Sequence, residues 1–201
     1  MGERVAVLAS GSGTNLQALL DDDEVGPCVV LVMSDRPDAS ALARARDRGV
    51  ETVVFDPASY PSRQAHDDAI ARALADRAID VVVLAGYMRI IGPQVVAAFR
   101  HRIVNVHPAL LPAFPGARAV ADALAYGVRV TGVTVHLVDE QVDHGPILRQ
   151  EAVEVLEDDT VASLTERLHE VEHRLLPAAT GDVLDGRVRI DGRRVAIGGD
   201  R

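Results

Sequence analysis

Three side chains in this sequence have types and spacing that suit chemistry at a carbonyl group. Asn105 and His107 are two residues apart in the apolar stretch "IVNVHPALLP", and Asp143 lies in the polar segment "DEQVDHGP". Side chains two apart on a strand share a face, so the amide and the imidazole would point the same way. An Asn donor, a His acid and an Asp proton acceptor would suit attack on a carbonyl carbon. The alternative is a structural pair whose polar groups are satisfied at a strand end.

The same residues predict direct transfer of a group to an external nucleophile. The single cysteine, Cys28, lies in an apolar run that reads as a buried strand, and the loop serines resemble phosphate ligands. If Asp143 reaches His107, it should raise the pKa of the imidazole and fix its orientation. We expect no metal, because the chain has neither a cysteine cluster nor a His-Glu-x-x-His helix.

A glycine-rich loop, "ASGSGTNL", lies between the first predicted strand and the first predicted helix. Glycines let the backbone approach a ligand, and N–H groups at a helix N-terminus attract phosphate. Leu16 stands where the dinucleotide fingerprint needs a small residue, and the loop lacks the lysine of the nucleotide P-loop. A purely structural turn is the alternative reading of this loop.

A second loop, "LAGYMRIIGP", follows the fourth predicted strand. In a doubly wound sheet the first and fourth strands are neighbours, and ligands bind where their following loops separate. We therefore expect Gly13 and Met88 to face each other across a site. Taken alone, Met88 is better explained as a core residue.

Apolar and helical patterns alternate along the chain and predict the elements that hold these loops. Strands are expected at 4–9, 29–33, 52–55, 80–84 and 103–106. Helices are expected between them at 15–22, 40–48 and 62–77. This alternation indicates an α/β domain with a doubly wound, mostly parallel sheet.

The second half of the chain changes its pattern. Alternating stretches at 130–138 and 147–155 predict an antiparallel extension of the sheet. A helix capped by Thr160 should then run from about 160 to about 176, and Asp191-Gly192 should turn a final hairpin. With no linker or repeat in between, we expect one domain over 1–201.

Composition narrows the class of partner. The net charge is −9, aromatic residues make up 3% and tryptophan is absent. This composition argues against nucleic-acid binding, because an acidic chain repels phosphates and because bases stack on aromatic rings. No apolar run approaches the ~20 residues that span a bilayer, and no signal-peptide pattern is visible. A single cysteine fits a reducing compartment, so a cytoplasmic location is expected.

Four segments in combination carry a resemblance to a known family. They are "ASGSGTNLQALL", "DVVVLAGYMRI", "NVHPALLPAFPG" and "HLVDEQVDHGPIL". From about 4 to about 185 the chain resembles the phosphoribosylglycinamide formyltransferases of purine synthesis. The resemblance implies a Rossmann-like formyltransferase fold, with 10-formyltetrahydrofolate as cosubstrate and the amine of phosphoribosylglycinamide as formyl acceptor. It implies no metal and leaves a homodimer open.

The resemblance also implies roles for the residues at matching motif positions. The catalytic set is then Asn105, His107 and Asp143, with His107 as an imidazolium that donates to the developing oxyanion and the departing folate nitrogen. The residues that would bind phosphoribosylglycinamide are Gly13, Thr14 and Asn15 at its phosphate, Met88 at its glycinamide and Glu172 at its ribose. The folate side is Arg63, Arg89, Ile90 and Ile91, together with Asn105 and Asp143. The corresponding parts of the domain are a phosphate-binding half at 1–100, a catalytic and folate-binding half at 101–185 and a hairpin at 186–201.

Helical periodicity by itself leaves Glu172 as one of many charges on an exposed face. Three positions depart from the usual pattern of the family: Ala113 stands where a basic residue is common, Arg118 where histidines are common, and His144 where glycine is common. A formyltetrahydrofolate deformylase, with water as acceptor, is the nearest rival function. A non-catalytic nucleotide-binding module is the rival of another class, and it would leave the catalytic set without a task.

Overall fold

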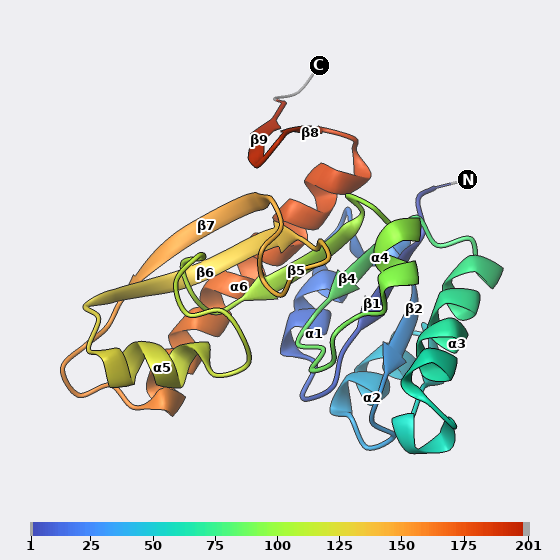
Figure 1. Cartoon of the computed structure of the whole chain (residues 1–201), viewed down its shortest axis with the longest axis horizontal. Helices are drawn as coiled ribbons and strands as arrows, with labels where there is room; N and C mark the ends of the chain where they lie inside the picture. Colours follow the sequence, from blue (N-terminus) through green and yellow to red (C-terminus); the bar gives the residue numbers. More distant parts are fainter. Residues whose placement is uncertain (1, 199–201) are drawn as a thin grey trace.

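The computed structural model describes residues 2–198 and contains a seven-stranded sheet with helices on both faces (Figure 1). The strand order is β3-β2-β1-β4-β5-β6-β7. The parallel strands are β1 Val5–Leu8, β2 Val29–Ser34, β3 Glu51–Val54, β4 Val81–Leu84 and β5 Ile103–His107. The antiparallel strands are β6 Val130–Leu137 and β7 Ile147–Glu154. The predicted doubly wound sheet with an antiparallel extension is confirmed.

Helices connect the strands and cover the sheet. They are α1 Thr14–Asp21, α2 Ser40–Asp47, α3 Arg63–Asp76, α4 Pro93–Ala98, α5 Ala119–Tyr126 and α6 Val161–Leu184, with short 3-10 turns η1 Gly26–Cys28 and η2 Pro57–Ser59. Val5 and Val7 of β1 share a core with α1, α2 and α6, whereas Ala6 and Leu8 share a core with α3 and α4. Because both faces are covered, the strand is apolar at every position.

The strand order reverses between β1 and β4, which are parallel neighbours. Ser10, just after β1, donates its N–H to the Gly86 carbonyl at 3.2 Å. Met88, after β4, donates its N–H to Ser10 Oγ at 2.9 Å. The loops after β1 and β4 are therefore joined directly at the position where ligands bind in such sheets.

The helix after β7 is longer than predicted. It begins after Thr160, which is its N-cap as expected and forms a capping box with Ser163, but it continues past Pro177 to Leu184. Proline removes one helical hydrogen bond. Leu176 and the following turns are nevertheless buried, and Thr180 Oγ1 donates to the Leu176 carbonyl at 2.8 Å. Burial of this face offsets the cost of the proline.

Two short helices lie where the sequence pattern predicts none. α4 starts with Pro93 at its first position, a common arrangement because the missing N–H has no helical partner there. α5 ends at Gly127, which has a φ of 82°. The prediction that Cys28 lies in a buried strand is wrong. Cys28 is the last residue of η1, directly before β2, and it is half-buried. The Leu111-Pro112 peptide bond is cis.

The C-terminal hairpin turns where it was expected. β8 Val188–Asp191 and β9 Arg194–Ile197 pair antiparallel, and Gly192 in the turn has a φ of 58°. The hairpin follows α6 and packs near β7 (Figure 1). The expected range of 186–201 ends outside the described residues. No helix within residues 2–198 is long and apolar enough to cross a membrane.

Candidate active site

The end of β5 presents the two polar residues that the sequence singled out. Asn105 is half-buried and His107 is 5% exposed. Strand register places Asn105 opposite His136 of β6 and His107 opposite Thr134. The antiparallel strand thus supplies polar neighbours to both residues, which would otherwise be buried among apolar side chains.

Asp143 reaches β5 from the loop between β6 and β7. Its Oδ2 lies 3.4 Å from His107 Nδ1 and accepts a hydrogen bond from the Gly116 N–H at 2.7 Å. Its Oδ1 lies 3.5 Å from Asn105 Nδ2. The φ of Asp143 is 52°, a left-handed conformation that costs a non-glycine residue about 1–2 kcal/mol. The structure therefore brings the three predicted residues together, with a strained backbone at one of them.

The protonation of His107 differs from the prediction. Burial lowers the pKa of this imidazole, and the opposing effects of the Asp143 charge and the Phe114 carbonyl do not restore it. Asp143 raises this pKa, as the sequence predicted, but desolvation at the buried strand end lowers it more. Nε2 lies 2.8 Å from the Phe114 carbonyl oxygen, so this nitrogen carries a proton and donates it.

The pKa of Asp143 is lowered. Burial would raise it, but the hydrogen bond from the Gly116 N–H and a positive charge on His107 or His136 lower it. Asp143 is therefore an ionised carboxylate at neutral pH. A proton on His107 Nδ1 would face this negative charge, which stabilises an imidazolium when one forms.

His136 is a member of this cluster that sequence reasoning missed. It is 1% exposed, and its Nδ1 lies 2.9 Å from the Leu137 carbonyl oxygen, so Nδ1 carries the proton. Nε2 then accepts from Asn105 Nδ2 at 3.0 Å. The second amide hydrogen of Asn105 has only the 3.5 Å contact to Asp143. The alternating pattern of 130–138 predicted the strand that carries this histidine, but only the register of β6 on β5 places it beside Asn105.

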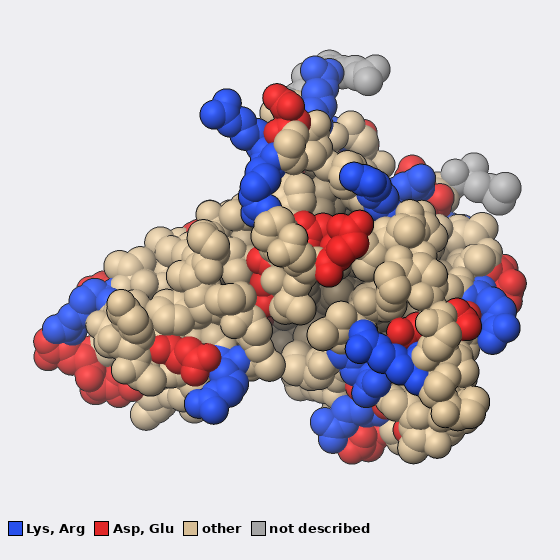
Figure 2. Space-filling view, in the orientation of Figure 1, with Lys and Arg blue, Asp and Glu red and all other residues tan. Residues whose placement is uncertain are grey.

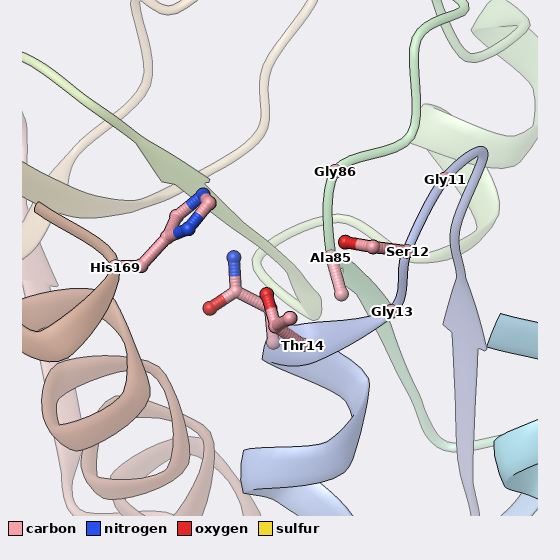
Figure 3. Close-up of a pocket in the computed structure, with 8 residues that line it drawn as sticks. Gly11, Ser12, Gly13, Thr14, Ala85, Gly86 and His169 are labelled. Carbon is pink, nitrogen blue, oxygen red and sulfur yellow. The ribbon is translucent and has the colours of Figure 1, made fainter. Parts of the chain in front are cut away.

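A hollow of about 110 Å³ lies at the N-terminus of α1 (Figure 3). Its lining is Gly11, Ser12, Gly13, Thr14, Asn15, Ala85, Gly86 and His169. Gly13 has a φ of 73°, and a Cβ there would lie 2.7 Å from Ala41 Cα, so this bend requires glycine. Unpaired N–H groups at the start of α1 suit an anion in this hollow.

The hollow and the polar cluster are neighbours in the sheet. Leu84 at the end of β4 is in register with Asn105 of β5. Ala85 and Gly86, which line the hollow, follow Leu84 directly. The two candidate sites therefore belong to one edge of the sheet.

Glu172 lies beneath this hollow and not on an exposed helix face. It is 4% exposed, and Oε2 accepts a hydrogen bond from Asn15 Nδ2 at 2.6 Å. His169 Nε2 is 4.0 Å from the same oxygen, and Figure 3 shows its ring across the hollow from Thr14. Burial raises the pKa of Glu172, against the lowering effects of Asn15 and His169. His169 was also missed, because only the packing of α6 on α1 brings it here.

Met88, predicted to contact the glycinamide, and the residues predicted to contact the folate occupy different environments. Met88 is 69% exposed and Ile90 is 63% exposed, so the alternative of Met88 as a core residue is wrong. Arg63 Nη2 donates to the Ile90 carbonyl at 3.4 Å, and Arg89 is half-buried. Ile91 is 8% exposed and packs in the core beneath α3 and α4. Met88 and Ile90 thus expose apolar side chains in the loop that follows β4.

The three departures from the family pattern have separate structural settings. Ala113 precedes Phe114, whose contribution to His107 is a backbone carbonyl and does not depend on a basic neighbour. Arg118 is exposed, directly precedes α5 and lies 3.6 Å from Asp122 of that helix, outside the lining of the hollow. His144 accepts hydrogen bonds from Arg193 of the C-terminal hairpin. Within residues 2–198, no group of three or more His, Cys, Asp or Glu side chains could hold a metal ion.

Comparison with known proteins identifies the class to which this fold and site belong. A family model described as "Formyl transferase" matches residues 3–180, and the chain belongs to that family. It is 48% identical over 203 residues to a phosphoribosylglycinamide formyltransferase of Mycobacterium tuberculosis, covering 97% of this chain and 94% of the relative. These values place it among the phosphoribosylglycinamide formyltransferases.

Solved structures agree with this placement. The crystal structure of glycinamide ribonucleotide transformylase 1 from Symbiobacterium toebii is 51% identical with a TM-score of 0.94, covering 98% of this chain and 94% of that one. A formyltetrahydrofolate deformylase from Pseudomonas syringae has a TM-score of 0.89, but it is 27% identical and only 66% of it is covered. The comparisons favour the transferase over the deformylase.

We expect Glu172→Gln to raise the free energy of unfolding at pH 7.5, because it removes a buried charge whose pKa is raised. The folded state binds this proton more tightly than the unfolded state, so stability falls as pH rises from the unfolded value of 4.5 through the folded pKa. The gain should shrink toward pH 4.5, where wild type is protonated too. Urea unfolding measures the free energy of unfolding at both pH values, with the exposed Glu166→Gln as control. A Glu172→Gln protein no more stable than wild type at pH 7.5 contradicts the assignment.

Proposed function

We propose that this chain transfers the formyl group of 10-formyltetrahydrofolate directly to the amine of phosphoribosylglycinamide, a step of purine biosynthesis. The observation that carries the proposal is the meeting of Asn105, His107 and Asp143 at the sheet edge that also holds an anion-sized hollow. Membership of the formyl transferase family supports the reaction, and similarity to phosphoribosylglycinamide formyltransferases supports the pair of substrates.

The proposed chemistry is addition followed by elimination at the formyl carbon. The amine nitrogen attacks that carbon, and the carbonyl oxygen becomes an oxyanion. The bond from the formyl carbon to the folate nitrogen then breaks, and the folate nitrogen takes a proton. The amine loses its proton toward Asp143 through water, which balances the exchange and leaves tetrahydrofolate and the formylated amine.

Asn105 and His107 are the proposed donors to the oxyanion. Asn105 has one amide hydrogen held by His136 at 3.0 Å, and the other has only a long contact, which leaves it for the substrate oxygen. His107 Nε2–H points to the Phe114 carbonyl at 2.8 Å, and the substrate oxygen would replace that carbonyl as acceptor. Negative charge on the bound intermediate and on Asp143 would favour the protonated imidazole, against the effect of burial.

The substrate-binding roles are proposals that the surroundings support. The start of α1 with Gly13, Thr14 and Asn15 would hold the phosphate, because these residues line the hollow and the first N–H groups of a helix have no helical partner. The Glu172 carboxylate, already at hydrogen-bond distance from Asn15, would accept from the ribose hydroxyls. Met88 would line the glycinamide. The folate would contact Arg63, Arg89, Ile90 and Ile91, with Asn105 and Asp143 at its reactive end.

The binding partners and the cellular location are proposed from the same function. Small molecules are proposed as the only ligands, and a net charge of −9 supports this over nucleic acid. The cytoplasm is the proposed location. The division of the chain into functional parts at 100 and 185 stays a prediction. A homodimer also stays a prediction, which sedimentation of the purified protein would test.

The first test separates transferase from deformylase. Purified protein should convert 10-formyltetrahydrofolate to tetrahydrofolate only when phosphoribosylglycinamide is present, because the amine is the nucleophile. Absorbance of the folate and mass spectrometry of the formylated product measure this. Full-rate turnover without the amine would refute the transferase and favour the deformylase. No turnover under either condition would favour the non-catalytic module.

The second test concerns the oxyanion donor. Asn105→Ala should lower kcat by roughly 10²–10³, the usual effect of losing one preorganised donor. The exposed Gln141→Ala, an amide in the loop that carries Asp143, serves as the control and should retain wild-type kcat. Thermal unfolding of both variants shows whether the fold is retained. A folded Asn105→Ala enzyme with wild-type kcat would remove Asn105 from the mechanism.

A further inference from the structure

The C-terminal hairpin contacts the loop that carries Asp143. The family match ends at residue 180, so the hairpin of β8 and β9 lies beyond the shared family domain. Its turn nevertheless reaches the segment between β6 and β7. Figure 2 shows basic side chains on the hairpin above acidic side chains nearer the centre of the same face. The hairpin carries Arg189, Arg193 and Arg194, and the loop between β6 and β7 carries Asp139, Glu140 and Asp143.

Arg193 makes the contacts between the two segments. Its Nη2 donates to the His144 carbonyl oxygen at 2.6 Å, and its Nη1 donates to His144 Nε2 at 3.0 Å. His144 Nδ1 in turn donates to Asp139 Oδ2 at 2.7 Å. One guanidinium therefore holds both the backbone and the side chain of His144, and His144 connects it to the first residues of the loop.

The residue before His144 is Asp143, which has a φ of 52°. Such a conformation persists in a non-glycine residue only when the surroundings hold it. On one side Gly116 holds the carboxylate by its N–H at 2.7 Å. On the other side Gly145 is pressed against the Leu137 carbonyl, where a Cβ would come within 1.8 Å. The peptide between these two points is the one that Arg193 binds.

We propose that Arg193 is a positioning residue for formyl transfer: through the His144 carbonyl, it holds the Asp143 carboxylate at His107. This inference rests on the proposed function and extends it to a residue outside the family domain. It also gives His144, a departure from the family pattern, a task, since its imidazole joins the hairpin to Asp139. Within residues 2–198, the charged or titratable side chains that act on His107 are Asp143 from the loop and His136 from β6, and only the first depends on Arg193.

The test compares Arg193→Ala, Arg193→Lys and the control Arg194→Ala. Arg194 is the next residue of the hairpin, is exposed, and has no hydrogen bond or ion pair to the loop among the described residues. Arg193→Ala should lower kcat by roughly ten- to a hundredfold, the effect of a misplaced catalytic group, with KM for phosphoribosylglycinamide within about twofold. Arg193→Lys should recover part of the loss, and Arg194→Ala should match wild type.

Titration of the His107 ring by NMR provides a readout that a structural role would not move. The pKa of His107 should fall in Arg193→Ala, because the Asp143 charge that raises it is no longer held close. An Arg193→Ala protein with wild-type kcat and His107 titration would overturn the proposal. So would a loss of activity that follows a loss of thermal stability while the titration is unchanged. If wild type does not formylate phosphoribosylglycinamide, the proposed function fails, and the titration alone still decides the positioning.

Discussion

The contact between His107 and the Asp143 carboxylate is the interaction on which the candidate site depends. A parallel sheet alone would leave His107 at the end of β5 without a charged partner. The antiparallel pair β6 and β7 adds the loop that returns over this strand end. That loop needs Asp143 in a left-handed conformation and Gly145 tight against Leu137 to bring the carboxylate within 3.4 Å of the imidazole. The extension of the sheet is therefore what turns a strand end into a candidate active site.

Several groups at the site are held in states that do not favour folding. Glu172 is a carboxyl group with a raised pKa in a buried place, and His107 is an imidazole whose pKa burial lowers. Met88 and Ile90 expose apolar surface. A large cluster of buried apolar residues lies on each face of the sheet, and its burial can offset these local costs. Local violations of folding rules that gather in one place are typical of functional sites.

Much of the frame could be predicted from the sequence, because strand and helix periods depend on local pattern. The parallel strands, the switch between β1 and β4, and the shared face of Asn105 and His107 all followed from spacing. Properties that depend on packing did not follow. The burial of Glu172 needs α6 against α1, and the lowered pKa of His107 needs the desolvation at the strand end. The position of His136 beside Asn105 depends on the register of β6. The contact of Arg193 with the loop depends on the packing of the C-terminal hairpin, and residue spacing predicts neither.

A double-mutant cycle on His107 and Asp143 tests the central claim most directly. The values of kcat/KM would be measured for wild type, His107→Ala, Asp143→Ala and the double variant, with His107 and the surface residue Asp122 as a control pair. If the two residues act as one unit, the double variant should lose little more than either single variant, since each single change already breaks the pair. Losses that add in free energy, as the control pair should show, would contradict the account.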